Sequence, residues 1–319
     1  MTAPIAPATT SASNAPTDPP AAPPASVRAR VPRRGRTGRP GGPSRAGRTL
    51  HAGPLTYGIL VVAVLFSAFP FYWTIVAASR SNADLAKVPP TLLPGPNLIR
   101  NFEAVLEEAD IGKALLNSFI VSGSITLGTV LCCTLAGFAF AKLRFRGRGA
   151  LLAITVGTMM IPPQLGVIPL FMLIAELGWV NQLQAVILPG LVSAFGVFFM
   201  RQYLTQTLPD ELIEAARVDG ASTARIFWSI VVPIARPGMA VLGLLTFMAA
   251  WNDFFWPVVA LTSSEPTVQV ALRQLGGGYV HDQSVIMAGT LLGTLPVLLV
   301  FGLLGRQIVG GIMQGAVKG

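Results

Sequence analysis

The chain has 319 residues, of which 52% are apolar and only 12% are charged, and its mean hydropathy is +0.62. In soluble domains roughly a quarter of the residues are charged, so the low charge indicates a protein solvated largely by lipid. The composition also excludes fibrous and wholly disordered classes. The net charge of +9 does not predict a nucleic-acid partner, because the basic residues gather in the first 50 positions and beside long apolar runs.

Residues 1–50 are rich in Pro, Ala, Ser and Thr and hold eight arginines. Such a segment buries too little apolar surface to offset the entropy lost on ordering, so a disordered tail is predicted there, with the folded domain over 51–319. We do not expect a secretory signal, because the apolar run that follows is too long for the core of a signal peptide.

Six apolar runs after this tail are long enough to cross a bilayer, which takes about 20 predominantly apolar residues. One of them, 237–261, is accepted although Asp253 interrupts it. The predicted spans are 52–79, 114–141, 149–175, 177–200, 237–261 and 284–305. The expected fold is therefore an all-α integral membrane protein with six transmembrane helices and both termini on the same side.

Lysine and arginine are concentrated on one side of this topology, and that bias marks the cytoplasm. With the N-terminus inside, 18 of the 23 basic residues fall on the cytoplasmic side and 5 fall outside. Cytoplasmic N- and C-termini are therefore predicted. The large outer segments are then 80–113 and 262–283, and the inner loop 201–236 carries the densest charge of the folded domain.

The inner loop 201–236 predicts two short helices joined by a turn at the membrane surface, between spans four and five. Pro209 suits the first turn of a helix, and the carboxylates that follow it oppose the positive end of the helix dipole. Gly220 favours the left-handed conformation that ends a helix. Ser222 can cap a second helix, which we expect Pro233 to interrupt.

The first of these helices carries residues suited to contact with another protein. Ala215 and Ala216 have almost no side chain, so a partner's backbone could approach closely. Glu211 and Glu214 offer carboxylates to basic groups on that partner.

The residue order of this loop resembles the "EAA" signature of permease subunits from binding-protein-dependent ABC importers, except that Val232 stands where leucine is commoner. The pattern is Glu214-Ala215-Ala216, three residues, Gly220, nine residues, Ile230, one residue, Val232 and Pro233. Four further stretches resemble the carbohydrate branch of the family, specifically the maltose-type second permease subunit: Asn117-Ser118, Ile161-Pro162-Pro163-Gln164, Trp251-Asn252 and 310–319. The resemblance covers about 56–319.

This resemblance implies that the loop inserts into a cleft of a separate ATPase subunit and transmits its movement. The residues expected to make this coupling loop are Glu211, Glu214, Ala215, Ala216, Asp219, Gly220 and Pro233. The implied partners are a second homologous permease, two copies of an ATP-binding subunit and an extracellular substrate-binding protein, in a bacterial cytoplasmic membrane. Membrane lipid surrounds the chain, and no nucleic-acid partner is expected.

No cofactor is expected on this chain. A P-loop is missing, because Ala114 follows Gly112-Lys113 where Ser or Thr would be needed, so ATP and magnesium would bind the partner ATPase. Cys132 and Cys133 are adjacent in an apolar run, and the two histidines lie far apart, which offers neither a disulfide framework nor a zinc site. Together with Gly137, Cys133 is interpreted as a small residue that lets helices pack closely.

Five residues are candidates for the translocation path: Asn117, Gln164, Trp251, Asn252 and Asp253. Two interpretations of Asp253 remain open, an interfacial residue beyond the fifth helix or part of an outer gate where aromatic and polar groups suit a sugar. Pro162-Pro163 must disturb the third helix, either as a kink beside the path or as one that only improves packing.

The function that these features predict is the permease subunit of an ATP-driven sugar importer, of an oligosaccharide in particular, and not an enzyme. The same machinery with another polar solute, such as a polyol or a peptide, is the alternative. An ion-coupled secondary carrier is a more distant one, because such a carrier should hold paired ionisable groups near the membrane midplane and these spans hold none beyond Asp253.

Overall fold

The structure, a computed structural model, describes residues 53–277 and 282–316, with side chains up to Gly302. The predicted tail over 1–50 lies outside the described residues, as does His281. The chain divides into two units after Tyr57, and the arrangement given below is that of the second unit, from Gly58 onward.

The described residues are folded into helices and contain no strand. The first half of the chain forms α1 (Pro54–Ala78), α2 (Asn82–Leu85), α3 (Leu98–Glu108), α4 (Ile111–Lys142), α5 (Arg148–Thr158), the short 3-10 helix η1 (Pro163–Gly166) and α6 (Val167–Glu176). The second half forms α7 (Gln184–Gly190), α8 (Ala194–Thr207), α9 (Asp210–Val218), α10 (Thr223–Ile226), the π-helix η2 (Phe227–Val231), α11 (Val232–Trp251), α12 (Phe255–Ala260), α13 (Val268–Leu275) and α14 (Gln283–Ala316).

Within the described residues, five helical segments are long and apolar enough to cross a membrane, and a bent pair can supply a sixth. The five are Pro54–Ala78, Ile111–Lys142, Gln184–Thr207, Thr223–Trp251 and Gln283–Gly302. The bent pair, Arg148–Thr158 with Pro163–Glu176, turns by 92° at its break. The prolines at 162 and 163 therefore break the third predicted span, because they remove backbone donors from it.

The fifth predicted span, 237–261, is wrong at both ends. α11 ends at Trp251, and the chain turns before α12 begins at Phe255, with the Asp253 carboxylate accepting a hydrogen bond from the Phe255 amide (3.2 Å). At the other end Pro233 does not interrupt the helix: it directly follows the π-helical turn η2, where the hydrogen-bonding pattern of the α-helix is already changed. Thr223–Trp251 is thus one helical segment.

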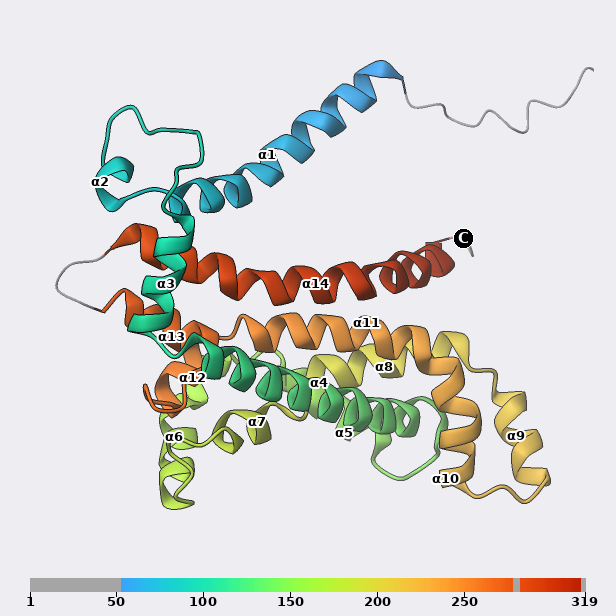
Figure 1. Ribbon diagram of the computed structural model, residues 1–319. Helices are drawn as coiled ribbons and strands as arrows, with labels where there is room; N and C mark the ends of the chain where they lie inside the picture. Colours follow the sequence, from blue (N-terminus) through green and yellow to red (C-terminus); the bar gives the residue numbers. More distant parts are fainter. Residues whose placement is uncertain (1–52, 278–281, 317–319) are drawn as a thin grey trace, which may run out of the picture. The chain divides into compact units, whose positions relative to one another are not determined.

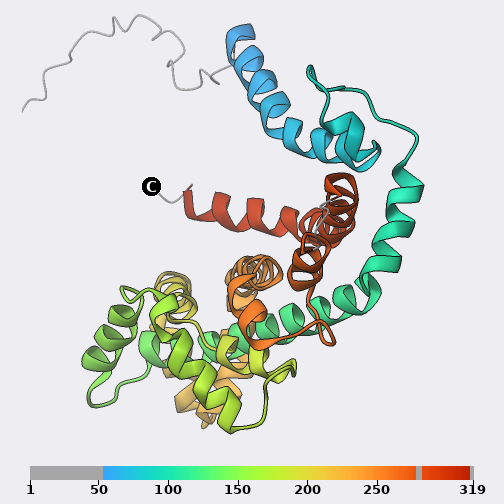
Figure 2. The same cartoon turned by 90° about the vertical axis from the view of Figure 1, so that its left-hand side faces the viewer.

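Helices α4, α8 and α11 lie side by side and form the centre of the bundle (Figures 1 and 2). Small residues bring α4 and α8 together: a Cβ added to Gly137 would lie 2.7 Å from the Cβ of Met200. The Cys133 thiol donates to the carbonyl oxygen of Ser193 (3.4 Å). These contacts support the interpretation of Cys133 and Gly137 as packing residues.

The packed core extends from this bundle into α9 and α10. Ile213 of α9, with Ile226 and Phe227 at the start of the next helical segment, is buried against Phe138 and Leu204 in one cluster. Buried apolar anchors therefore hold the segment 209–222 at the end of the bundle (Figure 1).

Candidate functional site

α9 and α10 form the predicted pair of helices, with a turn whose chemistry matches the sequence pattern. Pro209 is the N-cap residue (φ −63°, ψ 143°), one position before the first turn in which it was expected. Gly220 has φ +76°, the left-handed conformation that glycine adopts at little cost. The Ser222 hydroxyl accepts a hydrogen bond from the Arg225 amide (3.3 Å) and caps α10, as predicted.

α9 has two faces with different surroundings. One face, formed by Asp210, Ile213, Glu214 and Arg217, lines a cavity against α4 and α5. The opposite face is exposed and holds most of the remaining predicted coupling residues, Glu211, Ala215 and Asp219, beside the exposed apolar side chains of Leu212 and Val218. Ala216 lies at the boundary and is half-buried.

The cavity beneath α9, here called the inner polar cavity, has a volume of about 370 Å³. It is lined by Ala141, Lys142, Arg144, Arg148, Asp210, Ile213, Glu214 and Arg217. Lys142 donates to the Asp210 carboxylate (2.7 Å), although the Lys142 side chain is only 7% exposed while that of Asp210 is 72% exposed. This hydrogen bond, with the positive charges of Lys142, Arg144 and Arg148, lowers the pKa of Asp210.

A second cavity, of about 620 Å³, lies among α4, the break between α7 and α8, and α11. Its lining is Ile125, Thr129, Gly190, Ser193, Phe195, Leu242, Leu245, Thr246, Ala249, Ala250 and Asp253. We call it the bundle cavity. Of the five path candidates, Asp253 is the one that lines it. The cavity's hydroxyl groups, on Thr129, Ser193 and Thr246, were not predicted from the sequence. Uncharged polar residues inside apolar spans were the available signal.

The other path candidates lie elsewhere. Trp251 is 2% exposed, and its indole packs against Phe119 and Phe247 instead of lining the bundle cavity. The indole therefore lies within the helix packing, and its place at an outer gate stays a prediction. Asn252 is exposed, and its amide donates to the Met248 carbonyl oxygen (2.8 Å).

The third-span candidate, Gln164, lies in η1 at the break in the bent pair, where its side chain is exposed. Pro233 is exposed in the first turn of α11 and follows the π-helical segment η2.

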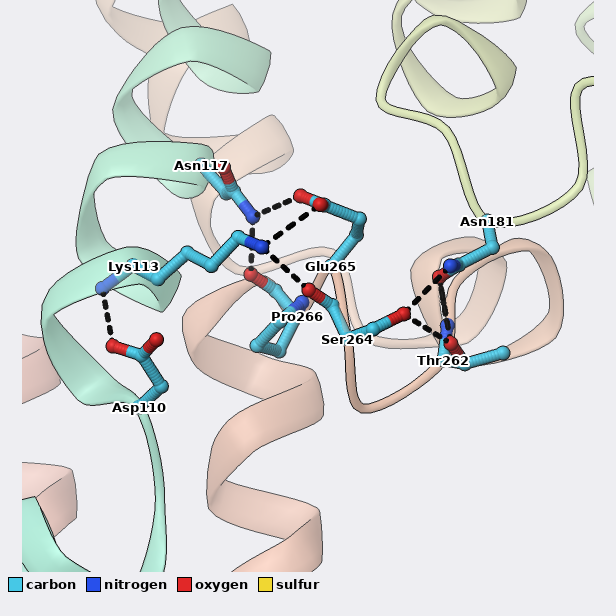
Figure 3. Close-up of polar contacts among 8 residues, drawn as sticks. All are labelled: Asp110, Lys113, Asn117, Asn181, Thr262, Ser264, Glu265 and Pro266. Carbon is cyan, nitrogen blue, oxygen red and sulfur yellow. Dashed lines mark hydrogen bonds and ion pairs between the residues drawn. The ribbon is translucent and has the colours of Figure 1, made fainter.

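Asn117 belongs to a polar network near the N-terminal end of α4 (Figure 3). Its amide donates to the Pro266 carbonyl oxygen (3.0 Å) and to the Glu265 carboxylate (3.3 Å). The Glu265 carboxylate also pairs with Lys113 (2.8 Å), and both contacts lower its pKa, with the Lys113 hydrogen bond as the largest cause. Asn117 thus fixes the loop between α12 and α13 and does not line the bundle cavity.

The same loop is held from a third segment. The Asn181 side-chain oxygen accepts hydrogen bonds from the amide (2.9 Å) and hydroxyl (2.7 Å) of Thr262, while its amide donates to the Ser264 hydroxyl (2.7 Å) (Figure 3). Asn181 has φ +62°, a conformation that asparagine tolerates better than most residues. Partners about 80 and 150 positions apart cannot be paired from one sequence, so this network was missed.

Comparison with curated proteins finds relatives that match most of the chain. The sn-glycerol-3-phosphate transport system permease protein UgpE of Yersinia enterocolitica is 33% identical over 80% of this chain and 94% of its own length. The lactose transport system permease protein LacG of Rhizobium radiobacter is 34% identical over 82% and 95%. The arabinooligosaccharides transport system permease protein AraQ of Halalkalibacterium halodurans is 33% identical over 83% and 96%.

The fold is also found in a solved structure. A chain of a bacterial ABC transporter involved in the import of the acidic polysaccharide alginate matches with a TM-score of 0.68 at 22% identity, over 79% of this chain and 94% of that one. Residues 133–312 match the family described as "Binding-protein-dependent transport system inner membrane component". This chain therefore belongs to that family and is a multi-pass protein of a bacterial inner membrane.

Proposed function

We propose that this chain is the permease subunit of an ATP-driven importer whose cargo is a sugar, in particular an oligosaccharide. The observation that carries the proposal is the corner α9–Gly220–α10, which presents an exposed face of α9 and is anchored to the bundle through Ile213 and Ile226. Relatives whose names give lactose and arabinooligosaccharides support the sugar.

In this proposal six spans cross the membrane, with the bent pair as the third, and both termini and α9 lie in the cytoplasm. A separate ATPase pair would contact the exposed face of α9 through Glu211, Ala215 and Asp219. ATP and magnesium would bind those subunits, and no cofactor would bind this chain. A second, homologous permease would complete the path, and a binding protein would dock outside, as in the solved alginate transporter complexed with a periplasmic protein.

The continuous segment from Thr223 to Trp251 offers a direct mechanical link. Movement of the corner at Gly220 would be transmitted along α11, whose residues Leu242, Thr246 and Ala249 line the bundle cavity. The π-helical turn over 227–231 lies between the two ends, and such turns are frequent at functional sites. ATP-driven closure of the motor would in this way switch the path between inward-facing and outward-facing states.

The test is the paired substitution Ala215→Leu and Ala150→Leu in the complete transporter. Both alanines are exposed, so both variants should fold, but the first adds bulk to the outer face of α9 and the second adds it to α5. We expect Ala215→Leu to abolish co-purification of the ATPase and ATP-dependent uptake, and Ala150→Leu to preserve both. Equal behaviour of the two variants would refute the coupling role of this face.

The cargo is tested separately, with labelled lactose, an arabinooligosaccharide, a polyol phosphate and a peptide offered to cells with and without this chain. Loss of oligosaccharide uptake alone supports the sugar. Loss of polyol phosphate uptake would instead support the alternative that the sn-glycerol-3-phosphate relative suggests. An ion-coupled carrier would be indicated if the purified chain alone concentrated any of these solutes in vesicles.

A further inference from the structure

The inner polar cavity brings four basic side chains and two carboxylates together around one concave space: Lys142, Arg144, Arg148, Arg217, Asp210 and Glu214. We propose that this cavity binds a phosphate group, supplied either by the headgroup of an anionic phospholipid or by a free phosphate ion. Guanidinium groups suit this ligand, because each presents paired N–H donors to two oxygen atoms.

Two of the basic residues already have partners. Lys142 neutralises Asp210 through the 2.7 Å ion pair. Arg148 donates to the carbonyl oxygens of Leu143 and Ala141, both at 3.2 Å, and so satisfies backbone acceptors where α4 ends. These contacts hold the wall of the cavity in place and remove one carboxylate from competition with an incoming anion.

The guanidinium groups of the other two arginines, Arg144 and Arg217, make no hydrogen bond or ion pair with any side chain or backbone group in the described part of the chain. They come from different elements, the loop after α4 and the last turn of α9, yet both line the same cavity. Besides Asp210, the cavity holds one further carboxylate, that of Glu214, and its single negative charge faces the positive charges of Arg144, Arg148 and Arg217. The cavity therefore keeps a net positive charge with donors available for phosphate oxygens.

The position of the cavity favours a ligand at the membrane surface. Ala141 and Lys142 are the last residues of α4, the segment Ile111–Lys142 that is long and apolar enough to span a bilayer. The end of such a segment lies at headgroup depth, where basic pockets between helices bind anionic headgroups. A volume of about 370 Å³ accommodates a phosphate with part of a headgroup.

Ligand binding would also constrain α9. Asp210, Glu214 and Arg217 lie on the cavity face of this helix, so a phosphate bridging Arg217 to Arg144 would tie α9 to the end of α4. An effect on transport, which rests on the proposed function, would follow because the opposite face of α9 remains free for a motor subunit. The binding itself does not depend on that function.

The experiment uses the purified full-length chain, stripped of lipid, with two charge-matched double variants. Arg144→Gln with Arg217→Gln removes the free cavity arginines, whereas Arg146→Gln with Arg225→Gln removes two exposed arginines that do not line the cavity. The probes are phosphatidylglycerol, phosphatidylcholine and inorganic phosphate. Native mass spectrometry counts the lipid molecules retained by the chain. The midpoint of its thermal unfolding reports stabilisation by each of the three probes.

We expect the cavity variant to lose about tenfold or more in affinity for the anionic probe that wild type binds, phosphatidylglycerol or inorganic phosphate, and the control variant to stay near wild type. If the chain retains phosphatidylglycerol in preference to phosphatidylcholine, and inorganic phosphate does not displace it, the ligand is a lipid headgroup. Stabilisation by phosphate alone identifies the free ion. Arg144→Lys with Arg217→Lys, which keeps the charge, should restore part of the binding. Equal losses in the two glutamine variants, or no binding by wild type, would overturn the proposal.

Discussion

The Trp251 indole donates a hydrogen bond to the carbonyl oxygen of Gly293, 3.1 Å away, and joins the end of α11 to α14. Both residues are buried, and the indole also stacks on Phe247 and meets Phe119 edge-on. The residue that the sequence suggested as part of a sugar gate thus also anchors the end of α11 against α14. The nearby Asp253 lines the bundle cavity together with residues of α11 such as Thr246 and Ala249.

Replacement of Trp251 by Ala should destabilise the folded chain by about 3–5 kcal/mol, because it removes a large buried side chain and a buried hydrogen bond. The matched control is Trp228→Ala, since the Trp228 side chain is 60% exposed and its loss should change stability little. Thermal unfolding of both variants in the same detergent measures the difference. If Trp228→Ala were equally destabilising, the assigned anchoring role of Trp251 would be wrong.

The features predictable from the sequence were those encoded locally. Apolar run lengths located the helical segments over 54–78, 111–142 and 283–302 to within a few residues. Gly220 and Ser222 predicted their turn and cap, and Pro162-Pro163 predicted a disturbed helix. What failed depended on tertiary contacts. Pro233 is accommodated within a continuous helix. The hydrogen bond that holds Trp251 is accepted by Gly293, 42 positions away, and could not be predicted either. The two faces of α9 likewise become distinct only when α4 and α5 pack beside it.

Gly137 should not tolerate alanine. Its added Cβ would lie 2.7 Å from the Cβ of Met200 and 2.8 Å from the backbone nitrogen of Arg201, so the α4–α8 contact would have to open. We expect a loss of about 1–3 kcal/mol, typical of overpacking. Gly123→Ala in the same helix meets nothing within 4 Å and should be neutral or stabilising. Thermal midpoints that moved equally for both variants would contradict this packing.

The Lys113–Glu265 pair predicts an acid-dependent loss of stability. The folded-state pKa of Glu265 is lowered, chiefly by the Lys113 hydrogen bond, from an ordinary value of 4.5. Its contribution is therefore complete above that value and disappears as the pH falls through the lowered pKa. The difference in thermal midpoint between wild type and Glu265→Gln should be largest near neutral pH and shrink on acidification. A difference in thermal midpoint that grew in acid would contradict a stabilising role of the ionised Glu265 carboxylate.

Substitutions of Gly220 test whether the corner between α9 and α10 needs its left-handed turn. An added Cβ would meet nothing within 4 Å, so any effect of substitution must come from the backbone conformation at φ +76°. The left-handed region costs an ordinary L-residue about 1–2 kcal/mol, and a β-branched residue is the least tolerated there, whereas asparagine visits it readily. We expect Gly220→Val to loosen α9 most, Gly220→Ala less, and Gly220→Asn least. Hydrogen exchange of peptides covering 208–222 measures this order, with peptides of the α4–α8 contact unchanged in every variant. Faster exchange in Gly220→Asn than in Gly220→Val would mean that the turn is not held in the left-handed conformation.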